Sequence, residues 1–242
     1  MTIGGERVDL LPERAAWWPR RSTLLLADLH LGKEETFRRH GIAMPEALLD
    51  DALGRLERLL ATLGPERLLV IGDLIHGRTG LTDAVVERFA ATRERFPGRV
   101  ELVVGNHDRH VRSLPARWRI EVRDEDQDDG PFCYRHEPST FLVEDPGPPA
   151  SPGPPASPGP QASPGPQSSP GRPTGSVPWS GPVEWAGHLH PTLRAGGVAV
   201  PAFVVAERQV ILPAFTAFSR GPGIAPGPGQ RVLPIVGGAV LA

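Results

Sequence analysis

The sequence has very little cysteine and very little lysine. Among its 242 residues, Cys133 is the single cysteine and Lys33 is the single lysine. One cysteine excludes an internal disulfide and is typical of a protein from a reducing compartment, and we expect Cys133 to be a small buried hydrophobic residue. Of the 26 basic residues, all except Lys33 are arginines. Because of this bias, an arginine near a candidate site does not by itself indicate a phosphate contact.

The chain also lacks a strong net charge and long hydrophobic runs. The 26 basic and 28 acidic residues give a net charge of −2 and an isoelectric point near 6.5, which excludes a global basic signature for nucleic acid. No run approaches the roughly 20 apolar residues that span a bilayer. The first residues contain no apolar stretch typical of a signal peptide, because Glu6, Asp9 and Glu13 lie among them. We therefore expect a soluble, cytoplasmic protein with no membrane partner, in which any contact with nucleic acid is local.

A low-complexity segment interrupts the second half of the chain at about residues 146–178. Four six-residue units of Ala, Ser, Pro, Gly, Gln and Arg follow one another between residues 150 and 173. Such a segment buries too little apolar surface to offset its ordering entropy, so we predict a disordered Pro/Gly/Ser/Ala/Gln-rich insert. Glycine recurs every sixth residue rather than every third, which excludes collagen. The remaining length suits one domain spanning residues 1–242.

The first half of the chain alternates buried strands with amphipathic helices. We predict strands at residues 24–27, 67–72 and 99–104 and helices at residues 45–64 and 82–97. Such alternation predicts an α/β domain whose strands end at one edge of a sheet, where ligands bind. Between these elements we expect a polar loop at residues 33–41, and the acidic run at residues 124–129 is interpreted as a solvated turn.

Further short strands are expected on both sides of this region. They are predicted at residues 7–11, 118–122, 132–135, 183–186, 198–206, 209–212 and 232–236.

Metal-ligating side chains gather where these predicted strands end. The candidates are Asp28, His30, Asp73, Asn106, His107, His136, His188 and His190. Carboxylate, amide and imidazole ligands suit a pair of ions such as manganese, iron or zinc, and the lack of thiolates argues against a structural zinc site. Outside this set, we interpret His40, His76 and His110 as ordinary exposed or hydrogen-bonded residues.

Five motifs at these positions carry a resemblance to a known family. In chain order they are Asp28-x-His30, Gly72-Asp73, Gly105-Asn106-His107-Asp108, a lone His136, and Gly187-His188-x-His190. Together they resemble the motifs of the calcineurin-like binuclear metallophosphoesterases. The resemblance implies an α/β fold (α+β in some schemes): a four-layer αββα sandwich of two mixed sheets flanked by helices, with two divalent metals at the strand ends.

The family pattern also implies a role for each of these side chains. One metal would be bound by Asp28, His30, Asp73 and His190, and the other by Asp73, Asn106, His136 and His188, so that Asp73 bridges. Phosphoesters would be hydrolysed by a hydroxide that the two metals activate. The catalytic residues would be His107, which protonates the leaving group or stabilises phosphorane-like charge, and Asp108, which orients His107.

A narrower resemblance concerns the residues around the first, second and fourth motifs. The sequences Asp28-Leu-His30-Leu-Gly32-Lys33, Gly72-Asp73-Leu-x-His76 and His136-Glu137-Pro138 are similar to the bacterial endonucleases of ligase-associated DNA damage response clusters. Two departures from the broad family, the missing acid after Asp73 and the His-Glu pair in place of His-Gly, match this subgroup. It implies manganese-dependent cleavage of single-stranded DNA in DNA repair, together with a helicase, an exonuclease and a DNA ligase.

The sequence leaves room for a local DNA contact and for two other functions. Four basic residues flank the motifs and are expected to bind the DNA backbone: Lys33, Arg38, Arg39 and Arg109. One alternative is a phosphodiesterase or phosphatase that acts on small molecules with the same metals. The other is a non-catalytic scaffold that docks through the Pro-rich insert, which the complete set of seven expected ligands disfavours.

Overall fold

The fold is that of a computed structural model, which describes residues 1–45, 47–110, 113–139, 181–195, 198–217, 219, 221 and 223–241. The predicted insert at residues 146–178 lies outside the described residues. Among the described elements, the helices are η1 (Pro19–Arg21), α1 (Lys33–Arg39), α2 (Leu48–Leu63), α3 (Asp83–Arg95), η2 (Asp108–His110) and η3 (Ala116–Trp118). No helix of the described residues is long and apolar enough to cross a membrane.

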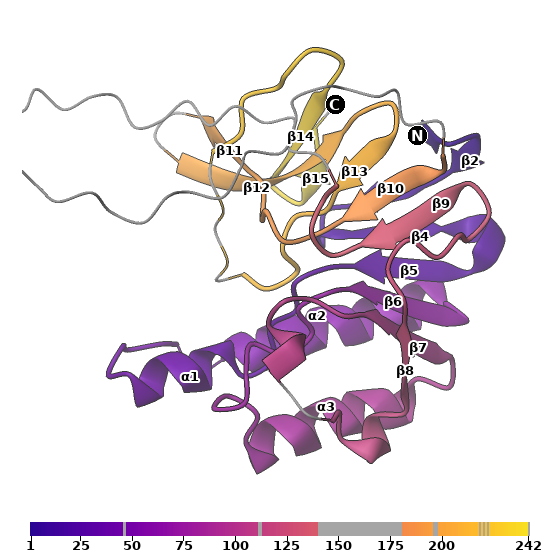
Figure 1. Cartoon of the computed structure of the whole chain (residues 1–242). Coiled ribbons are helices and arrows are strands. Elements are labelled where there is room, and N and C mark those ends of the chain that lie inside the picture. Colours follow the sequence, from indigo (N-terminus) through magenta and orange to yellow (C-terminus); the bar gives the residue numbers. More distant parts are fainter. Residues whose placement is uncertain are drawn as a thin grey trace, which may run out of the picture. The chain divides into compact units, whose positions relative to one another are not determined.

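Two mixed sheets form the centre of the fold (Figure 1). The first has the order β3 (Asp9–Leu11), β4 (Ala15–Trp18), β5 (Thr23–Leu26), β6 (Arg67–Ile71), β7 (Arg99–Val103) and β8 (Ile120–Arg123). The second has the order β15 (Ala239–Val240), β14 (Arg231–Val236), β12 (Val198–Val205), β13 (Gln209–Ile211), β10 (Val183–Ala186) and β9 (Phe132–Arg135), and β11 (Thr192–Ala195) pairs with β12. A separate hairpin joins β1 (Thr2–Ile3) and β2 (Glu6–Arg7).

Parallel pairing brings the ends of the central strands to one edge. Strands β5 to β8 are parallel to one another, as are β9, β10 and β13. Each of β5, β6, β7, β9 and β10 is followed by one of the five sequence motifs. The alternation of strands and helices in the first half therefore places the first three motifs at one edge, as predicted, and the second sheet brings the other two.

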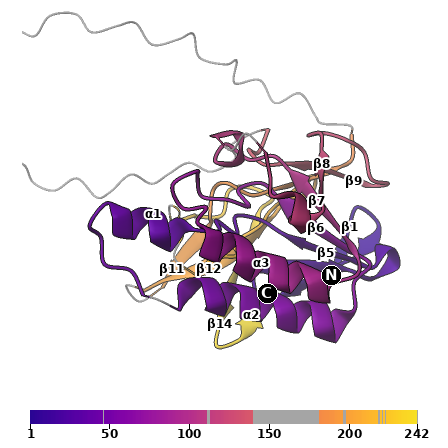
Figure 2. The same cartoon turned by 90° about the horizontal axis from the view of Figure 1, so that it is seen from below.

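The first sheet is buried on both faces. On one face, Leu24 packs in a cluster with Leu56 of α2 and Phe89 of α3, and Figure 2 shows these two helices lying across that face. On the other face, Leu25 packs with Trp185 of the second sheet. Burial on both faces explains why these strands read as continuous apolar runs.

The predicted fold class is confirmed, with one difference in its layers. The two mixed sheets and the helices on the first sheet form an α/β sandwich. Within the described part of the chain, however, no helix follows Trp118. A helical layer over the second sheet is therefore not seen among these residues.

The segment after the first motif is a helix, so the prediction of a polar loop was wrong. Helix α1 begins after Gly32, which has a left-handed φ of 77°. Its first turn carries Glu34 and Glu35 and its last turn carries two arginines, an arrangement that the helix dipole favours. Apolar periodicity did not reveal α1 because Phe37 is its only large apolar residue.

The acidic run is not wholly solvated, because Asp129 belongs to a buried network. Arg67 forms an ion pair and hydrogen bond with Asp129, lies 3.5 Å from Glu101, and donates a hydrogen bond of 3.0 Å to Thr23 Oγ1. Burial opposes ionisation of Asp129, but the hydrogen bond and charge of Arg67 outweigh it and lower the pKa of this carboxyl. Asp129 therefore stabilises the fold at neutral pH, and that contribution is lost as the pH falls through its lowered pKa.

Removing Arg67 should destabilise the protein strongly. Its side chain is 8 % exposed, so Arg67→Met leaves Asp129 without its buried ionic partner, at a cost of about 3 kcal/mol, while Glu101 keeps Arg123 at 3.0 Å. Arg99→Met is the matched control, since Arg99 is 64 % exposed and 3.6 Å from the same Glu101, and should cost only about 0–1 kcal/mol. Urea unfolding measures both, and equal losses would contradict the network.

Candidate metal centre

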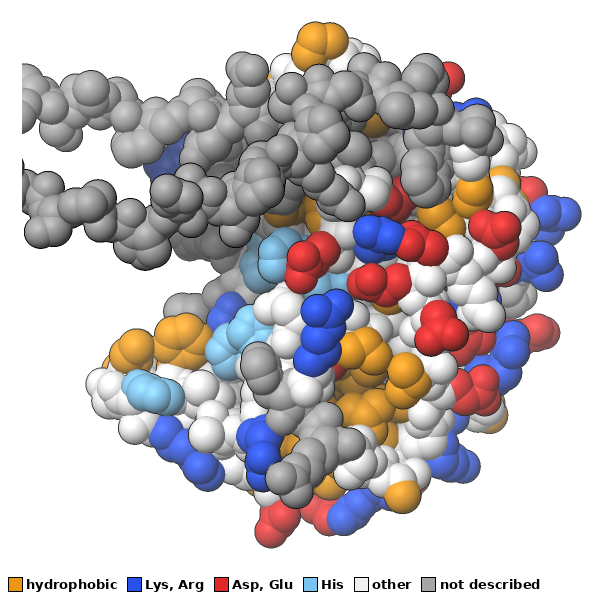
Figure 3. All heavy atoms as spheres, in the orientation of Figure 1, with side chains coloured by type: hydrophobic (Ala, Val, Ile, Leu, Met, Phe, Trp, Pro, Cys, Tyr) orange, Lys and Arg blue, Asp and Glu red, His pale blue; other side chains and the backbone are white. Residues whose placement is uncertain are grey.

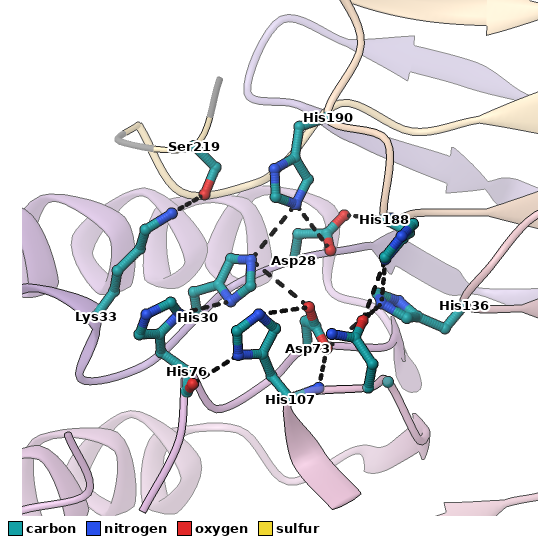
Figure 4. Close-up of polar contacts among 12 residues, drawn as sticks. Asp28, His30, Lys33, Asp73, His76, His107, His136, His188, His190 and Ser219 are labelled. Carbon is teal, nitrogen blue, oxygen red and sulfur yellow. Dashed lines mark hydrogen bonds and ion pairs between the residues drawn. The ribbon is translucent and has the colours of Figure 1, made fainter. Parts of the chain in front are cut away.

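The five motifs converge on one site at the ends of the two sheets. Figure 4 shows the side chains of loops that follow β5, β6, β7, β9 and β10 pointing toward one another. Asp28, His30, Asp73 and His136 form a buried floor, each at most 2 % exposed. The other predicted ligands are half-buried: Asn106, His188 and His190. The site is thus buried on the side of the first four residues and accessible on the side of the other three.

The backbone at this site has an unusual conformation. Nine described residues other than glycine have a left-handed φ, and five of them are predicted ligands: Asp28, His30, Asp73, His188 and His190. This conformation is uncommon for such residues and is found where surrounding contacts enforce it, often at functional sites. Here the His30 amide donates to the Asp73 carbonyl (2.8 Å), which ties the first two loops together.

One cluster lies around His30 and His190. Their Nε2 atoms are 3.4 Å apart, and His190 Nε2 is 3.1 Å from Asp28 Oδ1. His30 Nε2 is also 3.8 Å from Asp73 Oδ2. Asp28, His30 and His190 offer ligand atoms that all lie within 4.8 Å of one another, close enough to hold one metal ion.

A second cluster lies around His136. Its Nε2 atom is 2.9 Å from Asn106 Oδ1, 3.3 Å from His188 Nδ1 and 3.4 Å from Asp73 Oδ1. The two oxygens of Asp73 therefore face different clusters: Oδ1 faces His136 and Oδ2 faces His30. This is the arrangement that a bridging carboxylate needs.

The donor atoms fit cations. His136 Nδ1 lies 3.3 Å from the Ile71 carbonyl, so this nitrogen donates and the Nε2 lone pair faces acceptor atoms. Burial lowers the pKa of His136, but Asp73 and Asp28 outweigh it and raise the pKa to about 9, so the surroundings of this ring favour positive charge. Among the described residues, buried Asp28 Oδ1 has no hydrogen-bond donor, although His190 Nε2 is 3.1 Å away.

His107 stands beside the two clusters with one nitrogen turned toward them. Its amide donates a hydrogen bond of 2.9 Å to Asp73 Oδ1, and its Nε2 atom is 3.9 Å from Asp73 Oδ2. The other ring nitrogen, Nδ1, lies 2.8 Å from the His76 carbonyl, to which it donates. The His107 side chain is 36 % exposed, so Nε2 can reach a substrate at the open side.

Asp108 does not orient the His107 ring, which corrects one predicted role. Its buried carboxylate accepts backbone hydrogen bonds from Ile75 (2.9 Å), Gly105 (2.9 Å) and Leu74 (3.4 Å). Burial raises the pKa of Asp108. The hydrogen bonds from these amides oppose this, and the charge of Asp73 adds to it. The carboxylate thereby links the second and third metal-binding loops, and the His76 carbonyl orients His107 instead.

His76 belongs to the site, although it was interpreted as an ordinary histidine. Its ring stacks on His107 with centroids 4.7 Å apart, and its Nδ1 atom is 3.4 Å from His30 Nδ1. The His76 ring also stacks on Phe37, with the ring centroids 5.8 Å apart. The spacing Asp73-x-x-His76 was the only sequence signal, and it does not reveal a stacking contact. His40 is exposed, as expected, while the His110 side chain lies outside the described part.

The predicted basic residues differ in their distance from the clusters. Lys33 is half-buried, donates to Ser219 Oγ (Figure 4), and has its pKa lowered by burial although Asp28 and Asp73 counteract this. Arg38 and Arg39 are exposed on α1, 3.1 Å and 3.6 Å from Glu35.

Arg109 is also exposed, next to the third motif. Of these four predicted residues, Lys33 is half-buried and the three arginines are exposed.

Gly72 permits the close approach of the second loop to His136. Its φ is 73°, and a Cβ atom there would lie 1.9 Å from His136 Nδ1. We expect Gly72→Ala to displace His136 and to weaken metal binding by about 10- to 100-fold. Gly64→Ala is the matched control, because Gly64 has a φ of 56° and its Cβ would meet no atom within 4 Å. Isothermal titration calorimetry measures the metal affinity of both variants, and equal affinities would refute the expected clash.

The sandwich with its two-cluster site defines a metal-dependent phosphoesterase. The calcineurin-like phosphoesterase model matches residues 22–148, about half of the chain, so the chain belongs to this family. Accordingly it is a hydrolase that acts on phosphoester bonds, and its site serves divalent metals.

Two solved structures are similar to the chain. One is a crystal structure of the Pseudomonas putida nuclease MPE, with 30% sequence identity, a TM-score of 0.73, and coverage of 99% of this chain and 96% of that chain. The other is a protein of unknown function from Aquifex aeolicus, with 22% identity, a TM-score of 0.36, and coverage of 52% and 65%. No curated protein sequence matches the chain.

The arrangement explains how phosphoester hydrolysis proceeds here. Divalent metal held by the Asp and His side chains of these clusters would supply Lewis acidity and an activated water nucleophile near neutral pH. Asp28, His30, Asp73 and His136 are buried, so a phosphate can reach the clusters only past the half-buried side chains of Asn106, His188 and His190. His107 Nε2 lies at that half-buried side, held by the bond from Nδ1 to the His76 carbonyl, where it can move a proton to or from a phosphate oxygen.

Proposed function

We propose that the protein is an endonuclease that cleaves single-stranded DNA with two manganese ions. The observation that carries this proposal is a convergence of side chains that could hold metal ions, in a chain 30% identical, over almost its whole length, to a solved bacterial nuclease. Manganese suits the ligand set because carboxylate, amide and imidazole groups are present and thiolates are not. The narrow sequence resemblance extends the proposal to DNA repair alongside a helicase, an exonuclease and a DNA ligase.

The proposed ligands follow the two clusters. The first metal is assigned to Asp28, His30, Asp73 and His190, and the second to Asp73, Asn106, His136 and His188. The distances of 3.4 Å and 3.8 Å from the two Asp73 oxygens to His136 and His30 support a bridging role. We propose that residues 1–242 form one domain, which the low-complexity segment at residues 146–178 interrupts in the sequence.

In this proposal the substrate strand lies over the open side of the site. His107 is the general acid for the leaving oxygen, the His76 carbonyl positions its ring, and Asp108 holds the second and third loops together. Lys33 is proposed to contact a phosphate, because it is half-buried at the first motif and its ammonium group donates to Ser219 Oγ. Arg38, Arg39 and Arg109 are proposed to bind neighbouring phosphates, and their exposure leaves them accessible.

Circular single-stranded DNA tests the proposal directly, because only an internal cut converts the circle to a linear strand. We expect purified protein with Mn²⁺ to linearise the circle, and a chelator to stop the reaction. Double-stranded circular DNA is the comparison substrate and should be cut much more slowly. Hydrolysis of a small phosphodiester without any cutting of the circle would favour the small-molecule alternative instead.

A further inference from the structure

A short apolar loop follows α1 near the metal centre. This α1–α2 loop comprises residues Gly41 to Pro45, and its Ile42 is 48 % exposed. The other large hydrophobic residues exposed in the described chain lie near its ends or on β8, β12 and β14. Figure 3 shows hydrophobic side chains at the protruding end of α1, close to exposed histidines.

The loop is held in place by helix α1. The Ile42 amide donates a hydrogen bond of 3.0 Å to the Phe37 carbonyl, and the Gly41 amide donates one of 2.9 Å to the Arg38 carbonyl. The Arg38 side chain also donates to the Pro45 carbonyl at 3.4 Å. Ile42 is therefore presented to solvent by an ordered backbone.

Helix α1 connects this loop to the reacting centre. Lys33, its first residue, lies at the site, and one turn later Phe37 stacks on His76, with an angle of 20° between the rings. His76 stacks in turn on His107, again at 20°. Three nearly parallel rings thus lead from His107 to α1, and the seven residues of α1 span only about 10 Å. A group bound at the loop can belong to the nucleotide next to the scissile phosphate.

Helix α1 ends in two exposed arginines before the loop, and α2 begins with two acidic residues, Asp50 and Asp51, after it. Arg38 and Arg39 are exposed and share Glu35 as partner, so the three side chains carry a net charge of +1. Exposed ion pairs contribute little free energy, and a phosphate can replace Glu35 at little cost. An arginine beside an exposed apolar side chain can contact the backbone phosphate of a nucleotide whose base lies on that side chain.

We infer that the α1–α2 loop binds an unpaired nucleobase of the strand being cut, with Ile42 as its main apolar contact. This inference rests on the proposed nuclease function and adds a determinant of specificity outside the metal ligands. A base in a single strand exposes its faces to such a contact, whereas a paired and stacked base does not. The loop therefore favours single strands over duplexes and over small phosphodiesters.

The test compares strands with and without bases. The substrates are a thymidine oligonucleotide and a strand of equal length whose sugars carry no bases, and each rate is divided by the rate on methyl p-nitrophenyl phosphate for the same preparation. We expect the wild-type protein to cut the thymidine strand about five- to tenfold faster than the base-free strand. For Ile42→Ser this preference should disappear, because the apolar contact is lost.

Val236→Ser is the matched control, since Val236 is 46 % exposed and lies on β14 of the second sheet. It should keep the wild-type preference. If Ile42→Ser also keeps the preference, or if the wild-type protein cuts both strands equally, the inference is overturned while the nuclease function stands. If the wild-type protein cuts neither strand but hydrolyses the small diester, the proposed function fails and the inference with it.

Discussion

Asp73→Asn should lower hydrolysis of both DNA and a small phosphodiester by at least about 10³-fold. Asparagine keeps the size of the side chain and can still accept the 2.9 Å hydrogen bond from the His107 amide. It lacks the negative charge that faces His30 on one side and His136 on the other. Both clusters therefore lose a ligand at once, and metal analysis of the purified variant should find fewer than two ions per chain.

The control for this variant is Asp83→Asn, which makes the same chemical change at an exposed position at the start of α3. It should leave both the activity and the metal content at the wild-type level. An Asp73→Asn protein that binds two ions and keeps a tenth of the wild-type rate would show that Asp73 does not bridge.

The sequence revealed most of the site because its ligands follow strands. The apolar runs before Asp28, Asp73 and Asn106 predicted three parallel strands, and parallel strands end at the same edge. Once that edge was predicted, convergence of the polar residues followed from topology. The structure therefore gives the distances between these candidate ligands, and it leaves the set of candidates largely as the sequence predicted it.

What the sequence could not reveal depends on contacts between loops. His76 follows Asp73 by three residues, but its stacking on His107 depends on how two separate loops fold. Asp108 was predicted to orient its sequence neighbour, whereas its carboxylate accepts amides from another loop. Helix α1 was missed because its stability comes from charged ends and from the packing of Phe37, not from an apolar stripe.

His107→Ala should slow DNA cleavage by about 10²–10⁴-fold but slow hydrolysis of a p-nitrophenyl diester much less. The reason is the leaving group: a deoxyribose oxygen needs a proton as its bond to phosphorus breaks, whereas p-nitrophenolate leaves without one. The His107 ring is fixed by the bond from Nδ1 to the His76 carbonyl, so Nε2 is the nitrogen that can deliver this proton.

A series of diesters with leaving groups of increasing basicity separates this role from charge stabilisation. For the wild-type protein the rate should depend weakly on leaving-group basicity, because His107 supplies the proton to each oxygen. For His107→Ala the dependence should become steep, since basic leaving groups then depart unprotonated. If the variant instead loses the same factor with every diester, His107 stabilises charge on the phosphate. Its Nε2, 3.9 Å from Asp73 Oδ2, would then act on the non-bridging oxygens and not on the leaving group.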